Sequence, residues 1–118
     1  MQVTKFVQDG AIYSRTEYEN GAIVVEKRDP RIGHDAPAEV MSGAAVIVTF
    51  RILDFDEEVR SDSGGMLRLD IEGTDINVPI VNGIGVLSLE LHDSATIRHR
   101  PPYFCDATFT EFTIEVTL

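Results

Sequence analysis

The segment Leu67-Arg68-Leu69-Asp70-Ile71-Glu72 alternates strictly between large aliphatic and charged side chains. Successive side chains of a β-strand point to opposite faces, so this period of two predicts a strand with one buried face and one wet face. The run Ala44–Leu53, upstream of it, is rich in valine and isoleucine, which suit a pleated and buried surface. Both segments therefore predict a sheet packed against a second layer.

The pattern continues over most of the chain. Strands are expected at residues 44–53, 66–72, 75–81, 85–92, 95–100 and 107–118, with turns at 61–65, 73–74, 82–83 and 101–102. About six strands in roughly 80 residues, at turn spacings of about 8–12 residues, indicate a β-sandwich or a small barrel. The fold class predicted is all-β.

Before this region, the dipeptides Asp9-Gly10 and Asn20-Gly21 favour two-residue hairpin turns. They predict a three-stranded meander over residues 2–28. The meander has too few apolar side chains to offset its ordering entropy, so we expect it to pack on the sandwich or on another subunit.

Residues 29–42 show no periodic apolar pattern and are interpreted as a linker or crossover. A short helix within Ala36–Ala45 is the weaker alternative there, because Gly43 limits its length. The expected organisation is a β-meander and linker at residues 1–35, followed by a sandwich at residues 36–118.

The net charge of the chain argues against some classes of binding partner. Twenty acidic and ten basic side chains give a net charge of -10, which argues against nucleic acid and anionic membranes as partners. The second part is the more acidic one, because residues 1–35 carry six acids and five bases while residues 36–118 carry fourteen and five. No apolar run approaches the roughly 20 residues of a membrane span, and no signal peptide core is present, so a soluble chain is expected.

Several segments together resemble bacterial and bacteriophage immunoglobulin-like (Ig-like) domains. They are Val46 to Asp54, the acidic loop ending at Gly64-Gly65, Leu67 to Gly73, Val81 to Leu89, and the closing segment Phe109–Val116. The resemblance covers about residues 44–118. The Cys…Trp…Cys core of antibody domains is absent, because the chain has one cysteine and no tryptophan.

The resemblance implies an Ig-like β-sandwich that acts by contact and not by catalysis. It implies a structural or attachment module of a phage particle, as in a tail, fibre or capsid decoration, or of a bacterial surface assembly. Protein partners, a homo-oligomeric state, a virion or cell-surface location and no cofactor are the corresponding expectations.

The densest acidic run lies between the first two strands of the second part. Its residues are Asp54, Asp56, Glu57, Glu58 and Asp62. Carboxylates on a flexible loop can supply several of the six to eight oxygens that calcium takes, although the spacing is not that of an EF-hand. A solvated acidic loop is the main interpretation, and a calcium site is the alternative.

Tyr103 and Phe104 follow two prolines and could form an exposed ledge for stacking a sugar or a protein side chain. This ledge carries the alternative function, a carbohydrate-binding β-sandwich assisted by calcium. A packed loop is the commoner outcome for such a sequence.

The remaining residues with reactive side chains do not form a known catalytic pattern. His34, His92 and His99 provide no recognisable zinc spacing, and Cys105 has no residue that would orient a neighbouring histidine. Gly83-Ile84-Gly85 is interpreted as a turn and not as a phosphate loop. The sequence thus predicts a protein that is not an enzyme.

Overall fold

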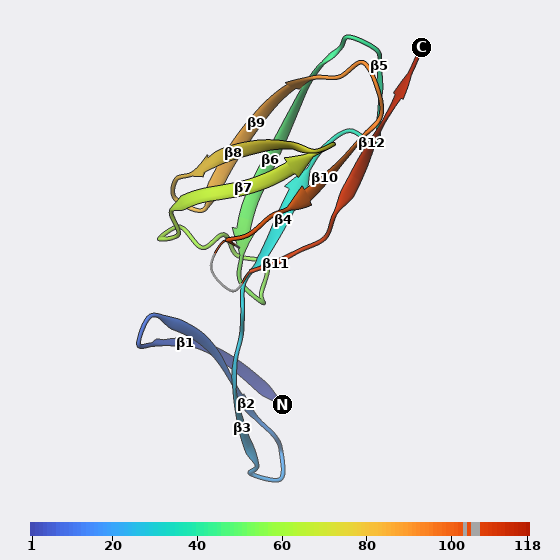
Figure 1. Ribbon diagram of the computed structural model, residues 1–118. Coiled ribbons are helices and arrows are strands. Elements are labelled where there is room, and N and C mark those ends of the chain that lie inside the picture. The colour runs from blue at the N-terminus through green and yellow to red at the C-terminus, as the bar shows by residue number, and fades with distance from the viewer. Residues whose placement is uncertain (103, 105–106) are drawn as a thin grey trace.

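The computed structural model describes residues 1–102, 104 and 107–118. Its strands form three sheets, and no helix occurs among the described residues. The all-β prediction is confirmed, and the described part of the chain holds no helix that could cross a bilayer. The strands and sheets are shown in Figure 1.

The first sheet contains three antiparallel strands in chain order, β1 (Gln2–Gln8), β2 (Ala11–Glu17) and β3 (Ile23–Lys27). Asp9 and Gly10 have φ values of 53° and 77° in the turn between β1 and β2. Positive φ at both central residues is the geometry that favours Asp-Gly in a two-residue hairpin. We call β1, β2 and β3 the N-terminal sheet.

The other two sheets face each other. One has the order β11-β4-β6-β9 and the other the order β5-β12-β10-β7-β8. The bounds of their strands are β4 Arg31–Asp35, β5 Glu39–Met41, β6 Ala45–Leu53, β7 Gly65–Ile71, β8 Thr74–Ile80, β9 Ile84–Glu90, β10 Ala95–His99, β11 Thr108–Phe109 and β12 Phe112–Thr117. The pairs β11·β4 and β12·β5 are parallel, and the other pairs are antiparallel.

The main core lies between these two sheets, in agreement with a β-sandwich. The side chains with the least exposure alternate along the inner faces of the strands, as the period of two predicts. They include Val46, Val48, Phe50 and Ile52 on β6, Leu67 and Leu69 on β7, Ile97 on β10 and Ile114 on β12. The alternation Leu67 to Glu72, which predicts a half-buried sheet, therefore supplies central core residues.

Residues 29–42, interpreted as a linker or crossover, do cross between the two sheets, but they also contain two strands. This segment contains β4, which pairs with β6, and β5, which pairs with β12. A sandwich at 36–118 therefore leaves out one of its strands. Val40 packs against the core from β5, so this part of the segment is a strand and not the short helix of the alternative interpretation. Only one or two apolar side chains enter the core from each strand, so neither strand produces a periodic pattern.

The N-terminal sheet lies outside the sandwich and is joined to it by the single crossing between β3 and β4 (Figure 1). The molecule measures 60 × 26 × 20 Å, and its Cα radius of gyration is 17.4 Å. A compact domain of this length would have a radius of about 13.5 Å. The elongation comes from a sheet that projects from the sandwich and does not join its core.

Candidate functional site

The N-terminal sheet contacts the sandwich through Lys5, which reaches the acidic loop. Lys5 on β1 places Nζ 3.3 Å from Asp54 Oδ2, 3.0 Å from Asp56 Oδ2 and 2.8 Å from Glu58 Oε2. The carboxylates of Glu58 and Asp56 raise the pKa of Lys5 far above its usual range, and the Lys5 ammonium lowers the pKa of Asp56. We call Lys5 and its three carboxylate partners the lysine latch.

The loop that receives Lys5 has its own internal support. Asp54 is buried, and its Oδ1 accepts a hydrogen bond of 3.0 Å from Arg60 Nε. The Glu57 amide donates to the Asp54 carbonyl, and the Asp54 amide donates to the Glu58 carbonyl. The turn is closed by these bonds, and Glu57 is further paired with Arg31 of β4. The carboxylates that meet Lys5 are thus held in place by the sandwich.

A second contact comes from Arg28, just after β3. Its guanidinium carbon lies 4.7 Å from the centre of the Phe55 ring, over the acidic loop. Its Nη1 also donates to Ser14 Oγ at 3.4 Å, and Ser14 is almost fully buried within the N-terminal sheet. Such cation–π contacts contribute about 0.5–1 kcal/mol at exposed sites. The arginine therefore ties the same loop to the middle strand of the N-terminal sheet.

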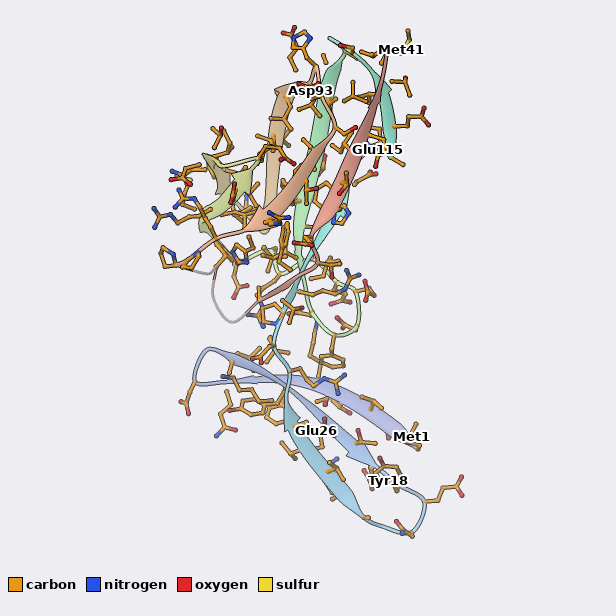
Figure 2. All side chains as sticks on the ribbon, turned by 45° about the vertical axis from the view of Figure 1, so that its right-hand side comes forward. Met1, Tyr18, Glu26, Met41, Asp93 and Glu115 are labelled. Atoms are coloured by element: carbon orange, nitrogen blue, oxygen red, sulfur yellow. The ribbon has the colours of Figure 1, made fainter. Side chains whose placement is uncertain are left out.

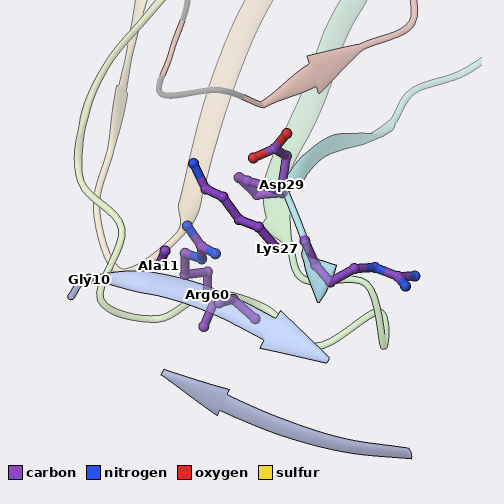
Figure 3. A pocket seen from close by; sticks show the side chains of 8 residues that line it. Gly10, Ala11, Lys27, Asp29 and Arg60 are labelled. Atoms are coloured by element: carbon purple, nitrogen blue, oxygen red, sulfur yellow. The ribbon is translucent and has the colours of Figure 1, made fainter. Parts of the chain in front are cut away.

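Two open depressions flank this junction. The first, of about 190 Å³, is lined by the β1–β2 turn, by the end of β3 and by Arg60 (Figure 3). The second, of about 250 Å³, lies on the other side of Arg28 and includes Asp54 and Phe55. Both are smaller than the roughly 300–1,000 Å³ of ordinary small-molecule sites. Because they lie between the N-terminal sheet and the sandwich, the two regions are not closely packed there.

Beyond this junction the N-terminal sheet is exposed. All five residues of β3 are exposed, and Ile23, Val24 and Val25 retain 51%, 39% and 54% of their surface. Val3 and Val7 on β1 are also more than half exposed. Figure 2 shows the side chains of this sheet spreading away from the sandwich around Met1, Tyr18 and Glu26.

The exposed aliphatic side chains occupy both faces of the sheet. Cross-strand partners share a face, and the register pairs Val24 with Thr16 and Val25 with Arg15. The face with Val24 also carries Lys5, which meets the sandwich, and Ile12, whereas Ile23 and Val25 share the opposite face. A small sheet with exposed aliphatic residues on both faces, attached mainly at one loop of the sandwich, is an incomplete structure by itself.

The acidic residues proposed for calcium do not all meet. Asp54, Asp56 and Glu58 converge on Lys5, Glu57 pairs with Arg31, and Asp62 is exposed. Within the described ranges, no group of three or more histidine, cysteine, aspartate or glutamate side chains is arranged to hold a metal ion. Asp54 differs from the solvated loop of the main interpretation, because it is buried with Arg60 and Lys5 against it.

Of the two residues of the predicted aromatic ledge, the structure describes Phe104, and this residue is not exposed. Phe104 is buried at 6% exposure and belongs to the sandwich core, where its ring lies beside Gly65. It is held there because its amide donates to His99 Nε2 at 3.1 Å. Tyr103 and Cys105 lie outside the described residues.

The histidines serve packing. His34 stacks on Phe112, with ring centres 3.7 Å apart, and His99 lies 5.4 Å from the ring of Phe109. Burial lowers the pKa of both imidazoles. His92 is exposed and lies near Glu90. His34 and His99 thus each lie against an aromatic side chain of the sandwich.

Sequence reasoning missed Lys5, Arg28 and Arg60, the three cations of the junction. The acidic run was visible, and Arg60 lies within it, but Arg28 and Lys5 are distant in the chain, Lys5 by 49 residues from Asp54. The available signal was electrostatic, since so dense a run of carboxylates favours nearby cations. Comparison with protein-family models, with curated proteins and with solved structures finds no match.

Proposed function

We propose that the protein is a non-enzymatic structural or attachment module, in which an Ig-like sandwich carries an N-terminal meander as its assembly element. The observation that carries the proposal is the N-terminal sheet, whose β3 is exposed along its whole length and is largely aliphatic. Soluble proteins seldom leave contiguous aliphatic surface uncovered unless a partner covers it.

The strand order supports the Ig-like part of the proposal. In one sheet β4 is antiparallel to β6, and the chain then crosses to the other sheet, where β5 is parallel to the last strand, β12. The remaining order resembles the two sheets of an Ig domain, with β6 beside β9 and with β12, β10, β7 and β8 in succession. Such sandwiches occur with many functions, so the function is argued from the surface and not from the fold.

The surroundings of the sandwich favour contact over catalysis. His34 and His99 pack against aromatic rings, and the two depressions at the junction are small and open. By the resemblance noted above, we place the module in a phage particle or a bacterial surface assembly.

The test is sedimentation velocity of the intact chain from micromolar to millimolar concentration, with a glycan array run beside it. The proposal predicts a sedimentation coefficient that rises with concentration and no selective glycan signal. A monomer throughout, with selective binding to one glycan class, would instead establish the carbohydrate-binding alternative. A chain beginning at residue 36 is unsuitable for this test because it lacks β4.

A further inference from the structure

The sandwich exposes an apolar surface on the outer face of the sheet that contains β6 and β9. Ile47 on β6 and Ile84 and Val86 on β9 retain 62%, 41% and 58% of their surface. The register places Thr49 opposite Val86, and Thr49 is two residues from Ile47 on the same side of β6. Cross-strand and diagonal neighbours of a sheet lie close together on one face. Ile47, Ile84 and Val86 therefore form one surface, which we call the sandwich patch.

The N-terminal sheet carries a comparable surface on the face opposite the lysine latch. Ile23 and Val25 of β3 are 51% and 54% exposed there, and Val25 is paired with Arg15 of β2. Phe6 and Tyr13 share this face and stack with ring centres 5.4 Å apart. Tyr13 is two residues from Arg15, so it is a diagonal neighbour of Val25. The four apolar side chains cross all three strands, and we call them the meander band.

We propose that the meander band of one copy of the chain packs face to face on the sandwich patch of a second copy. Sheets bury their apolar faces by packing against a second sheet in this way. The contact joins two different surfaces, so each copy can bind one neighbour through its N-terminal sheet and another through its sandwich. The inference rests on the proposed function and names the surface that covers the N-terminal sheet.

The division of charge along the chain favours this pairing over a contact between two sandwiches. Residues 1–28 carry four acidic and four basic side chains, whereas residues 29–118 carry sixteen acidic and six basic ones. Two sandwiches with ten excess negative charges each repel one another, whereas the neutral N-terminal sheet can approach a sandwich without that repulsion. The N-terminal sheet of a second copy is therefore a suitable occupant of the sandwich patch.

Arg51 gives the pairing a polar contact beside the apolar one. It lies on the same face as the sandwich patch and is partly buried, and its guanidinium forms no hydrogen bond or ion pair with the described residues. Asp35 is exposed on this face as well. The face with the meander band carries Arg15 and Glu17, which pair at 3.3 Å. Two arginines and two carboxylates thus meet in the contact, which balances their charges.

The exposed area agrees with a missing partner of ordinary size. The chain exposes 7220 Å², whereas a compact monomer of 13.1 kDa would expose about 6,400 Å². The difference, about 800 Å², matches what each partner contributes to a standard interface. It arises because the N-terminal sheet projects from the sandwich (Figure 1).

Two matched substitutions in the full chain test the two surfaces separately. Val25→Lys places a cation in the meander band, and Val86→Lys places one in the sandwich patch. The two valines are similarly exposed, at 54% and 58%. Each substitution should weaken self-association at least tenfold in sedimentation equilibrium. The control is Val3→Lys, because Val3 is 51% exposed on the opposite face of the N-terminal sheet. It should associate like the parent.

A mixture of the two variants tests whether the contact joins different surfaces. Val25→Lys retains an intact sandwich patch, and Val86→Lys retains an intact meander band. An equimolar mixture, with one variant carrying a fluorescent label, should therefore form a pair with one copy of each, although neither variant associates alone. The pair has no further intact surface and should stop at two copies.

Circular dichroism reports whether the variants retain the parent's sheet signal. If one of them does not, Val25→Thr and Val86→Thr take its place, because threonine keeps the branched shape that suits a strand. These milder variants should show the same pattern with smaller losses.

Each outcome decides a different statement. If the parent associates but Val86→Lys associates equally well, or if the mixture gives no pair, the proposed contact is wrong and the assembly function stands on another surface. The same holds if Val3→Lys weakens association as much as Val25→Lys does. If the parent is monomeric at every concentration, both the contact and self-assembly are wrong.

Discussion

The sandwich and the N-terminal sheet are made of the same kind of strand but are stabilised in different ways. β7 alternates so that Leu67 and Leu69 are fully buried between two layers, whereas every residue of β3 is exposed. The sandwich gains its stability from burial within one chain. The N-terminal sheet is held by backbone pairing, the lysine latch and Arg28, and it leaves its aliphatic residues for a partner.

The largest expected difference between the two regions is the cost of removing a buried side chain. Ile97→Ala opens a cavity in the fully buried centre of the sandwich and should lower the free energy of unfolding by about 2–5 kcal/mol. Val25→Ala removes an exposed side chain and should cost less than about 0.5 kcal/mol in dilute solution. Urea denaturation measures both, and equal costs would show that β3 belongs to the same core.

Two glycines with similar backbone angles give the next comparison. Gly10 in the N-terminal sheet has φ of 77° and open space where an alanine would place its methyl group, so Gly10→Ala should cost only about 1–2 kcal/mol of left-handed strain. At Gly83, φ is 78°, but a Cβ would lie 2.5 Å from the Arg60 carbonyl oxygen. Gly83→Ala should therefore be clearly more costly in thermal unfolding. A smaller loss at Gly83 than at Gly10 would contradict the tight packing of the sandwich.

The attachment between the regions should depend on Lys5, the one charged residue of β1. Lys5→Gln removes the ammonium from three carboxylates, which then repel each other, yet exposed ion pairs contribute only about 1 kcal/mol or less. The expected result is a sheet that changes its orientation while the sandwich stays folded.

Residual dipolar couplings of the two regions would show this as separate alignment. The control is Arg15→Gln, because Arg15 pairs with Glu17 inside the sheet. If both regions of Lys5→Gln share one alignment, Arg28 and the connecting segment are sufficient to hold the N-terminal sheet in its orientation.

The smallest expected effect is a pH dependence confined to the sandwich. Burial lowers the pKa of His34 and His99 below 6.5 in the folded protein, so the unfolded chain binds more protons as the pH falls below 6.5. The free energy of unfolding should decrease in that window and recover toward neutral pH. His34→Phe keeps a ring on Phe112 and should flatten the slope measured by urea denaturation. An unchanged slope would remove His34 from this explanation.

The sequence revealed those parts of the fold that are encoded locally. The alternation from Leu67 to Glu72 predicted the buried face of β7, and Asp9-Gly10 predicted the first hairpin turn. β4 and β5 were missed because short strands such as Arg31–Asp35 gain their identity from their partners β6 and β12. Local pattern contains no information about such partners.

Less of the candidate site could be predicted from the sequence, for the same reason. The acidic loop could be seen in the sequence, but its meeting with Lys5 depends on how a sheet 49 residues upstream is placed. Phe104 is chemically suited to an exposed ledge or to a core, and only the position of His99 and Gly65 puts it in the core. Both the contact of Lys5 with the acidic loop and the burial of Phe104 depend on tertiary structure.

The central claim is that the sandwich is complete within one chain and that the N-terminal sheet is completed by a second copy. Amide hydrogen exchange at micromolar and at near-millimolar concentration tests it directly. We predict that the amides of Ile23 and Val25 exchange rapidly when dilute and become protected when concentrated, while those of core residues such as Val48 and Leu69 are protected equally at both. Amides of β3 that exchange at the same rate at both concentrations would contradict the claim.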